Sequence, residues 1–480
     1  MSRVLVVSTY ELGAQPLGLA SVAGALRSAG HDVRAADLAV ESLDGVDLSW
    51  PDATCFSVPM HTALRLALSV RARLAAERGD MAACFFGLYA DAARVSGAVG
   101  RNDLFVAGEA LDAITSWLDG RVEPDHETIV ELGGVRARKS PSARDLLSPL
   151  DRYARFICGD AERLVGTVES TRGCNHKCRH CPVPVVYQGR SRVVDVEAVL
   201  DDIDELVALG AGHIRFADPD FLNRPAHALA VATGMHVRHP ELSFDATIKV
   251  EHLLRHREAV ARLSDLGLAF VVSAFESTSD AVLERLNKGH RAGDAAQAVR
   301  ELRAHGVEIR PSLLPFTPWT TRDDVVEILD FVAQNDLVEN LDAVQYSIRL
   351  LVPPGSLLLE LDDPTLRRAL GPFDPGALSY TWRSFDPVLD ELQKELAALI
   401  EEKESLGTSV EETYAAVREQ VFASFERSDP GRPPPRPPLG PPAMFRPRLT
   451  EAWFCCAEPT RAQIDAVTPI TWSRPTVVTQ

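Results

Sequence analysis

Residues 169–182 read ESTRGCNHKCRHCP and place Cys174, Cys178 and Cys181 at spacings of four and three. A glycine precedes the first cysteine, so a single tight loop can bring all three thiolates to one soft metal centre. A cubane iron–sulfur cluster needs four ligands, and three cysteines leave one iron open for another molecule. The loop therefore predicts an iron–sulfur site with one coordination position left for a further ligand.

A structural zinc loop is the alternative interpretation of the same cysteines. Zinc needs a fourth Cys or His nearby and usually sits between paired C-x-x-C knuckles. His176 and His180 lie inside the loop and are available as fourth ligands. Because the stretch has one cysteine group rather than two such knuckles, the iron–sulfur interpretation is preferred.

The first 120 residues alternate short β-branched or aromatic runs with helical stretches. Such alternation predicts an α/β, Rossmann-like domain in which helices cover both faces of a parallel sheet. Ligands of such sheets bind beyond the carboxyl ends of the strands, so loops 9–18, 59–62 and 87–90 form the expected pocket. The expected strands are 4–9, 31–36, 53–58, 82–87 and 104–107, and the expected helices are 16–29, 60–78 and 109–118.

An irregular, proline-bearing connector is expected over 121–160, and strand–helix alternation resumes over 161–375. Successive βα units predict a partial (βα)6 barrel of the TIM type, with its active site at the carboxyl ends of the strands. The cysteine loop directly follows the first of these strands. The expected strands are 166–170, 213–217, 243–249, 269–275, 308–314 and 343–350, and the expected helices are 196–209, 251–266, 281–287, 295–305 and 322–333.

A helical extension is expected over 376–428, with helices 386–403 and 411–426 and a Thr408…Glu411 capping pair. Residues 429–480 begin as a proline-rich, extended spacer and end in a tail that contains Cys455 and Cys456. Adjacent thiols suit a catalytic role, and the alternative is an incidental exposed pair. The tail also carries aromatic residues, so we expect it to dock on the protein.

Composition restricts the class of partner and the location of the protein. A net charge of -18 and a pI near 5.2 argue against nucleic acid, which requires concentrated Lys and Arg. The sequence has no apolar run long enough to cross a bilayer and no signal peptide, so we expect a cytoplasmic protein without membrane contact. Cys55 and Cys84 lie in apolar strands and are expected to be packed core thiols.

The motif Cys174-x3-Cys178-x2-Cys181 after the first strand of a (βα)6 pattern resembles the radical S-adenosylmethionine (SAM) superfamily. The resemblance implies that the three cysteines hold a 4Fe-4S cluster and that SAM binds the open iron. It further implies that an electron donor such as flavodoxin or ferredoxin reduces the cluster. Reductive cleavage of SAM then gives a 5′-deoxyadenosyl radical.

Other SAM contacts are implied by the same resemblance. His180 stands at the position near the adenine, and Asp218 and Asp220 stand where the family binds the methionyl amino group. Glu276 and Lys288 match a run that contacts the ribose and the methionyl carboxylate. The loop after the fifth strand departs from the family pattern, because Phe316 and Thr317 replace its common glycine.

The N-terminal domain resembles the cobalamin-binding domain of one class of radical SAM enzymes, which makes cobalamin a possible cofactor. The Asp-x-His-x-x-Gly motif that supplies an axial histidine is absent, and Gly87 stands alone where a glycine pair would pass the nucleotide tail. The run Cys455-Cys456-Ala457-Glu458-Pro459 resembles the tail of the CUAEP/CCAEP group of radical SAM proteins.

These features predict a radical SAM enzyme that modifies a small-molecule substrate. Methyl transfer, rearrangement, and sulfur or selenium chemistry at Cys455 and Cys456 are the reactions left open. One alternative is a tRNA methylthiotransferase, which needs three N-terminal cysteines and a basic RNA-binding module. The other is a non-enzymatic metal-binding protein that retains the fold.

Overall fold

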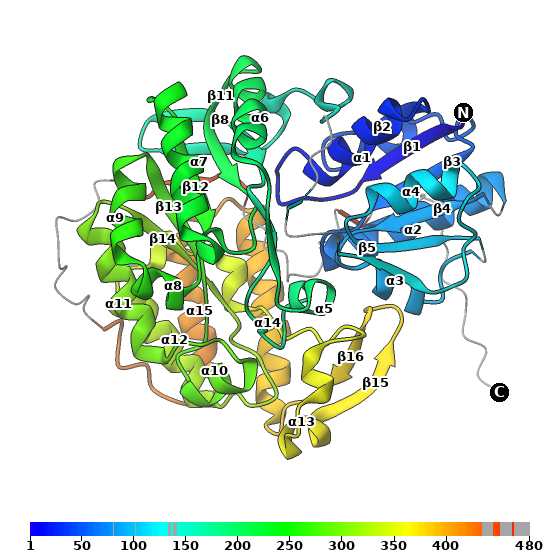
Figure 1. Cartoon of the computed structure of the whole chain (residues 1–480). Coiled ribbons are helices and arrows are strands. Elements are labelled where there is room, and N and C mark those ends of the chain that lie inside the picture. The colour runs from blue at the N-terminus through cyan, green and yellow to red at the C-terminus, as the bar shows by residue number, and fades with distance from the viewer. Residues whose placement is uncertain are drawn as a thin grey trace, which may run out of the picture.

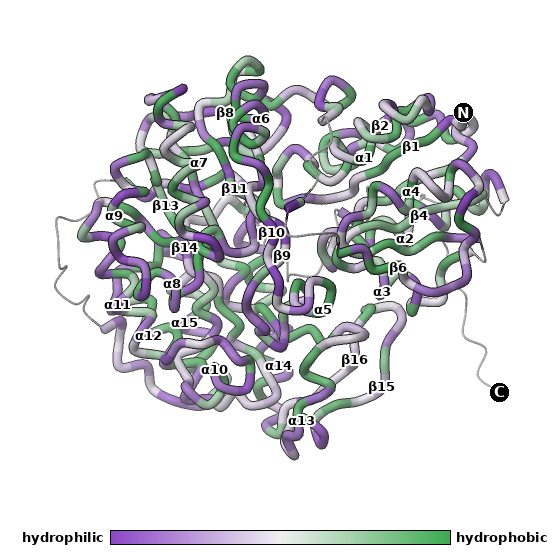
Figure 2. The backbone as a smooth tube through the Cα atoms, viewed as in Figure 1, coloured by the Kyte–Doolittle hydropathy of each residue, from purple (hydrophilic) through white to green (hydrophobic). Residues whose placement is uncertain are grey.

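The computed structural model describes residues 1–79, 81–100, 102–132, 136–137, 142–433, 445–451 and 463–464. An N-terminal α/β domain lies beside a barrel domain, and the helical extension packs against the barrel (Figure 1). Apolar segments are concentrated in the strands of both domains, whereas the outer turns of the helices are more polar (Figure 2). This α/β architecture was expected from the sequence.

The N-terminal sheet is parallel, with strand order β2-β1-β3-β4-β5-β6. One helix pair, α1 and α4, shares a core on one face of the sheet, and α2 and α3 share a core on the other. The order reverses between β1 and β3, which is where ligands bind in such sheets. The elements are β1 (Arg3–Ser8), α1 (Leu17–Ser28), β2 (Asp32–Asp37), β3 (Ala53–Ser57), α2 (His61–Arg78), β4 (Ala83–Phe86), α3 (Ala90–Val95), β5 (Leu104–Gly108), α4 (Leu111–Leu118) and β6 (Thr128–Glu131).

Two strands occupy the stretch expected to be an irregular connector. β6 pairs in parallel with β5 and extends the first sheet, and β7 (Arg155–Cys158) pairs antiparallel with the first barrel strand. β6 is a partly exposed edge strand of four residues, so it has no buried apolar run for a sequence pattern to detect. The connector is therefore shorter than 121–160.

The barrel sheet has strand order β14-β13-β12-β11-β8-β7-β17, and β8 to β14 run parallel. β7 and β17 (Arg448–Leu449) are antiparallel additions at the open edge. The parallel elements are β8 (Ala161–Val168), β11 (Ala211–Phe216), β12 (Ser243–Thr247), β13 (Leu268–Glu276) and β14 (Glu308–Leu313). The covering helices are α6 (Val196–Ala208), α7 (Pro225–Arg238), α8 (Val250–Arg255), α9 (Arg257–Asp265), α10 (Asp280–Leu286), α11 (Ala292–Ala304) and α12 (Arg322–Gln334).

The prediction of a sixth barrel strand at 343–350 is wrong. A 3₁₀ turn forms at Ala343–Tyr346, and the segment keeps a single bridge between Arg349 and Phe316. The Leu313 amide, which a sixth strand would engage, donates instead to the Gln345 side-chain carbonyl at 2.8 Å. A side chain thus replaces the missing backbone acceptor, and the barrel stays partial.

The C-terminal extension contains α13 (Pro364–Ala369), the hairpin β15 (Leu370–Asp374) and β16 (Ser379–Trp382), α14 (Pro387–Ser405) and α15 (Val410–Ser424). The expected helices are confirmed, but the capping box of α15 is Ser409 with Glu412 rather than Thr408 with Glu411. The expected helix 251–266 is divided into α8 and α9 at His256. No helix in the described part of the chain is long and apolar enough to cross a membrane.

Docking of the C-terminal segment is confirmed for its described residues. Leu449 in β17 is buried with Phe156 and Phe270, and Ile464 packs on the core of the N-terminal domain. Cys455 and Cys456 lie outside the described residues.

Candidate active site at the barrel mouth

The cysteine loop begins at a short antiparallel ribbon of β9 (Thr171–Gly173) and β10 (Ser191–Val193). Gly173 has φ +77°, and a Cβ there would lie 2.3 Å from the Arg190 carbonyl oxygen. Only glycine fits this close approach, so the residue before Cys174 is fixed by backbone geometry.

Asn223, which follows β11, clamps the start of the loop. Its Oδ1 accepts from the Asn175 amide at 3.1 Å and lies 3.7 Å from Cys174 Sγ, and its carbonyl accepts from Asn175 Nδ2 at 3.1 Å. Nothing in its sequence position singled out Asn223, because its role depends on the loop after β11 folding back over the loop after β8.

The other end of the loop rests on the segment after β13. The Arg179 amide donates to the Leu286 carbonyl at 2.9 Å, and Asn287 Nδ2 donates to the Lys177 carbonyl at 2.9 Å. Asn287 ends α10 in a left-handed conformation, φ +55°, which asparagine tolerates better than most residues. The loop is therefore fixed at both ends by different βα units.

The three thiols have the environment expected of cluster ligands. Cys174 and Cys178 are buried and Cys181 is partly buried. Burial raises the pKa of Cys174 to about 11, and burial together with the Cys178 thiol holds the pKa of Cys181 above its usual range. Buried thiols that resist ionisation on their own become thiolates when a cation binds. Three such sulfurs on one loop fit a 4Fe-4S cluster with one iron open to another ligand.

Glu276 ends β13 at φ +62° and is brought together with two other expected site residues. Its Oε1 accepts from Lys288 Nζ at 3.0 Å and lies 3.0 Å from His180 Nε2. Burial opposes ionisation of this carboxyl, but Lys288 and His180 outweigh it and hold the pKa of Glu276 well below its usual range. The group is thus a fixed anion between two nitrogen donors.

Asp218 and Asp220 follow β11 at the same mouth. Asp218 accepts from the Ser170 amide and hydroxyl, both at 2.7 Å, and from Thr171 Oγ1 at 2.6 Å. Burial nonetheless raises the pKa of Asp218 to about 6. Asp220 Oδ1 accepts from the Leu222 amide at 3.2 Å. Both carboxylates therefore contact the protein itself, and their contact with a cofactor stays a prediction.

A cavity of about 260 Å³ lies between the domains, at the carboxyl ends of β1 and β3. Its wall combines Leu17, Gly18, Phe86, Gly87 and Leu88 with Thr171, Arg172 and Tyr187 of the barrel domain. The loops expected to form the pocket of the N-terminal sheet therefore contribute to it. Glu11 also lines the cavity, and burial together with Asp37 raises the pKa of Glu11 to about 8.

Glu109, at the end of β5, couples this cavity to the cysteine loop. Glu109 Oε2 accepts from Arg172 at 2.7 Å, and Oε1 accepts from Arg192 at 2.9 Å. Both arginines lie in the ribbon that opens the loop. No sequence pattern predicted this contact, because it joins residues more than sixty positions apart.

Comparison with known proteins identifies the barrel. Residues 168–332 match the model of the radical SAM superfamily. This family uses a 4Fe-4S cluster and SAM.

The chain is 24% identical over 348 residues to a hopanoid C-3 methylase of Methylococcus capsulatus, covering 66% of this chain and 64% of that protein. It is also 24% identical to a bacteriochlorophyllide d C-8(2)-methyltransferase of Chlorobaculum tepidum, covering 50% of this chain and 54% of that protein. The chain thus matches less than two thirds of the length of these curated relatives.

Solved structures share the arrangement of both domains. The cobalamin-dependent SAM radical enzyme OxsB, with aqua-cobalamin bound, gives a TM-score of 0.67 at 15% identity over 89% of this chain and 72% of that one. The radical SAM methyltransferase TsrM from Kitasatospora setae, with cobalamin and a [4Fe-4S] cluster bound, gives a TM-score of 0.58 at 15% identity. This match covers 89% of this chain and 100% of that one. At this identity the likeness establishes the fold.

Proposed function

We propose that this chain is a radical SAM enzyme with its cluster on Cys174, Cys178 and Cys181. The observation that carries the proposal is that these three thiols stand on one loop that is fixed at both ends, within the matched domain. When bound, the cluster supplies the electron that cleaves the sulfonium of SAM.

Residues around the loop supply the binding of SAM. Glu276 is a fixed anion that can accept hydrogen bonds from the ribose hydroxyls, and Lys288 holds it in place. His180 shares Glu276 Oε1 and lies beside Cys181, where its ring can pack on the adenine. Asp218 orders the end of β8 through Ser170 and Thr171, so its part in SAM binding is to set the shape of the turn.

The substrate is a small molecule bound in the interdomain cavity, which lies next to the start of the cysteine loop through Thr171 and Arg172. The lining is largely apolar, with Glu11, Glu109 and Glu169 as its carboxyl groups. Two relatives named for methyl transfer favour methyl transfer as the finer assignment. An electron donor such as flavodoxin or ferredoxin completes the system.

The position and lining of the interdomain cavity bear on whether this chain binds cobalamin. The solved structures of OxsB and TsrM, which share both domains, have cobalamin bound, and the cavity lies at the carboxyl ends of β1 and β3, where ligands bind in such sheets. The described lining residues include no histidine that could serve as an axial ligand. Cobalamin is therefore kept as a possible cofactor, and no step is derived through it. Retention of a corrinoid spectrum after anaerobic reconstitution with hydroxocobalamin would support it, and the absence of that spectrum would remove it.

A methylthiotransferase is a weaker candidate, although several relatives carry that name. Cys55 and Cys84 are neighbours in β3 and β4, both fully buried, which confirms them as core thiols. Burial raises the pKa of Cys84 well above its usual range, which disfavours a thiolate there. These two thiols are therefore unsuited to a second, N-terminal cluster.

The test is anaerobic reconstitution with iron and sulfide, reduction, and incubation with SAM. Formation of 5′-deoxyadenosine supports the proposal, and its absence under several reductants contradicts it and favours a non-enzymatic metal-binding protein. S-adenosylhomocysteine formed together with a methylated product supports methyl transfer. A Cys455→Ala/Cys456→Ala variant tests the tail. Unchanged turnover of the substrate would show that these two thiols are not needed for the reaction.

A further inference from the structure

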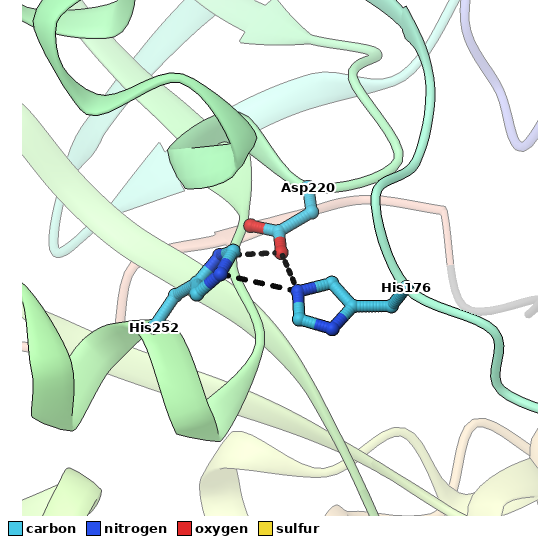
Figure 3. Close-up of side chains that lie close together, drawn as sticks. All are labelled: His176, Asp220 and His252. Carbon is cyan, nitrogen blue, oxygen red and sulfur yellow. Dashed lines mark hydrogen bonds and ion pairs between the residues drawn. The ribbon is translucent and has the colours of Figure 1, made fainter. Parts of the chain in front are cut away.

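A group of nitrogen and oxygen ligands lies next to the cysteine loop but contains no cysteine. His176 comes from the loop, Asp220 from the turn after β11, and His252 from α8 after β12 (Figure 3). Their nearest ligand atoms all lie within 4.8 Å of one another. His176 Nε2 is 3.1 Å from His252 Nε2 and 3.7 Å from Asp220 Oδ2, and His252 Nδ1 is 2.8 Å from Asp220 Oδ2.

Two buried atoms of this group have no hydrogen-bond partner among the described residues. Asp220 is 0% exposed, and although its Oδ1 accepts from the Leu222 amide, its Oδ2 makes no hydrogen bond. His252 is 7% exposed, and its Nδ1 makes none either, despite lying close to that oxygen. Asp220 Oδ2 and His252 Nδ1 form an ion pair at 2.8 Å that lacks hydrogen-bond geometry, so both atoms are open to a cation between them.

We propose that His176, Asp220 and His252 bind one first-row divalent transition ion such as Zn²⁺ or Fe²⁺. Nitrogen and oxygen ligands bind such ions at roughly 2.0–2.2 Å, which places neighbouring ligand atoms about 3–3.5 Å apart. The observed separations are close to this range. Two imidazoles with one carboxylate are a ligand set that these metals prefer, and three protein ligands leave a position open.

The charges around the group support a cation. Glu251 Oε2 lies 3.7 Å from His176 Nδ1, on the far side of the ring from Asp220, where it can orient the imidazole. Lys249 Nζ lies 3.7 Å from the same Glu251 oxygen, and Arg255 contacts the other oxygen of that carboxylate. Glu251, which is not itself in the ligand set, therefore partly balances these two cations.

The ion would act on the cysteine loop by position. His176 lies between Cys174 and Cys178, so metal binding ties that part of the loop to the segments after β11 and β12. The rest of the loop is already fixed by Asn223 and Asn287. The proposal does not depend on the proposed function, because its ligands are distinct from the cluster cysteines.

The test uses Co²⁺ as the probe in a Cys174→Ala/Cys178→Ala/Cys181→Ala background, which removes the thiolate ligands. We expect one equivalent of Co²⁺ with d–d absorption and without sulfur-to-metal charge transfer. Adding Asp220→Asn or His252→Ala should weaken binding at least about tenfold. His305→Ala, on an exposed residue at the end of α11, is the matched control and should bind normally.

Folding is controlled by circular dichroism and by the melting temperature with and without Co²⁺. His176→Gln, on a partly exposed loop residue, gives a ligand variant that leaves the two buried positions intact. Co²⁺ should raise the melting temperature of the background but not that of His176→Gln. The proposal is overturned if the background protein binds no Co²⁺. It is also overturned if Asp220→Asn leaves Co²⁺ binding to the background unchanged but lowers the affinity of the cluster-containing protein for SAM.

Discussion

The barrel mouth and the interdomain cavity both lie at the carboxyl ends of parallel strands, yet their side chains differ in kind. The mouth gathers thiols, imidazoles, carboxylates and a buried lysine around the loop that begins at Cys174. The cavity wall is largely apolar, with Glu11, Glu109 and Glu169 as its carboxyl groups. Chain topology thus provides two similar positions, and side-chain chemistry assigns them to different tasks.

Under the proposed function, this difference separates cofactor chemistry from substrate binding. At the mouth, charged groups are paired and fixed, as Glu276 is by Lys288 and His180. In the cavity, burial keeps Glu11 protonated over much of the physiological range. Variants in one region should therefore change the cleavage of SAM, whereas variants in the other should change the affinity for the substrate.

Replacing one cluster ligand should give the largest effect. Cys174→Ala is expected to abolish 5′-deoxyadenosine formation, because the cluster loses one of its three thiolates. Iron content, the visible spectrum and product analysis after anaerobic reconstitution check this outcome. Cys158→Ala, at the end of β7 and away from the loop, is the control and should retain both iron and activity. A Cys174→Ala protein with full iron content and activity would place the cluster elsewhere.

The buried ion pair at the mouth should dominate stability. Glu276→Gln leaves the Lys288 ammonium buried without its counter-charge and should cost about 3–5 kcal/mol of unfolding free energy. Urea denaturation measures the loss. The double variant Glu276→Gln/Lys288→Met should recover part of it, because no unpaired charge remains. Equal stability of the single variant and the wild type would show that the pair is solvated.

A substitution that fills the cavity tests whether the cavity and the barrel mouth have separate tasks. The Cβ position of Gly18 is 3.2 Å from Ser57 Oγ and 3.7 Å from Phe86, so Gly18→Leu places a side chain in the substrate space. We expect KM for the substrate to rise about tenfold, or ~1.4 kcal/mol, with uncoupled 5′-deoxyadenosine formation unchanged. Ser28→Leu, exposed at the other end of α1, is the control. If Gly18→Leu weakened substrate binding and also abolished uncoupled 5′-deoxyadenosine formation, the two regions would not have separate tasks.

The smallest effect concerns pH. Burial and Asp37 raise the pKa of Glu11 from 4.5 to about 8, so the folded protein keeps a proton that the unfolded chain loses. Stability should therefore fall as pH rises from about 4.5 to about 8. Glu11→Gln removes the contribution of this group and should therefore raise the melting temperature more at pH 8 than at pH 5. Scans at pH 5 and pH 8 check it, and parallel shifts at both values would contradict it.

Much of the fold followed from local sequence patterns. Apolar runs bounded by turns predicted β1 to β5 and the parallel barrel strands β8, β11, β12, β13 and β14, because buried strands need continuous apolar residues. The ribbon of β9 and β10 was not predicted. The edge strands β6 and β7 and the turn at 343–346 were missed or misassigned. Their state depends on pairing partners and on one side chain, Gln345, and not on their own composition.

For the site, the sequence by itself indicated the proposed cluster ligands, because Cys174, Cys178 and Cys181 lie close enough along the chain to stand in one loop. It also indicated Glu276 and Lys288, which are separated by one helix. Only the tertiary structure brought Asn223, Glu109 and His252 to that loop. These side chains arrive from separate βα units, and the distances that matter are set by packing of the barrel against the N-terminal sheet, which no local spacing encodes.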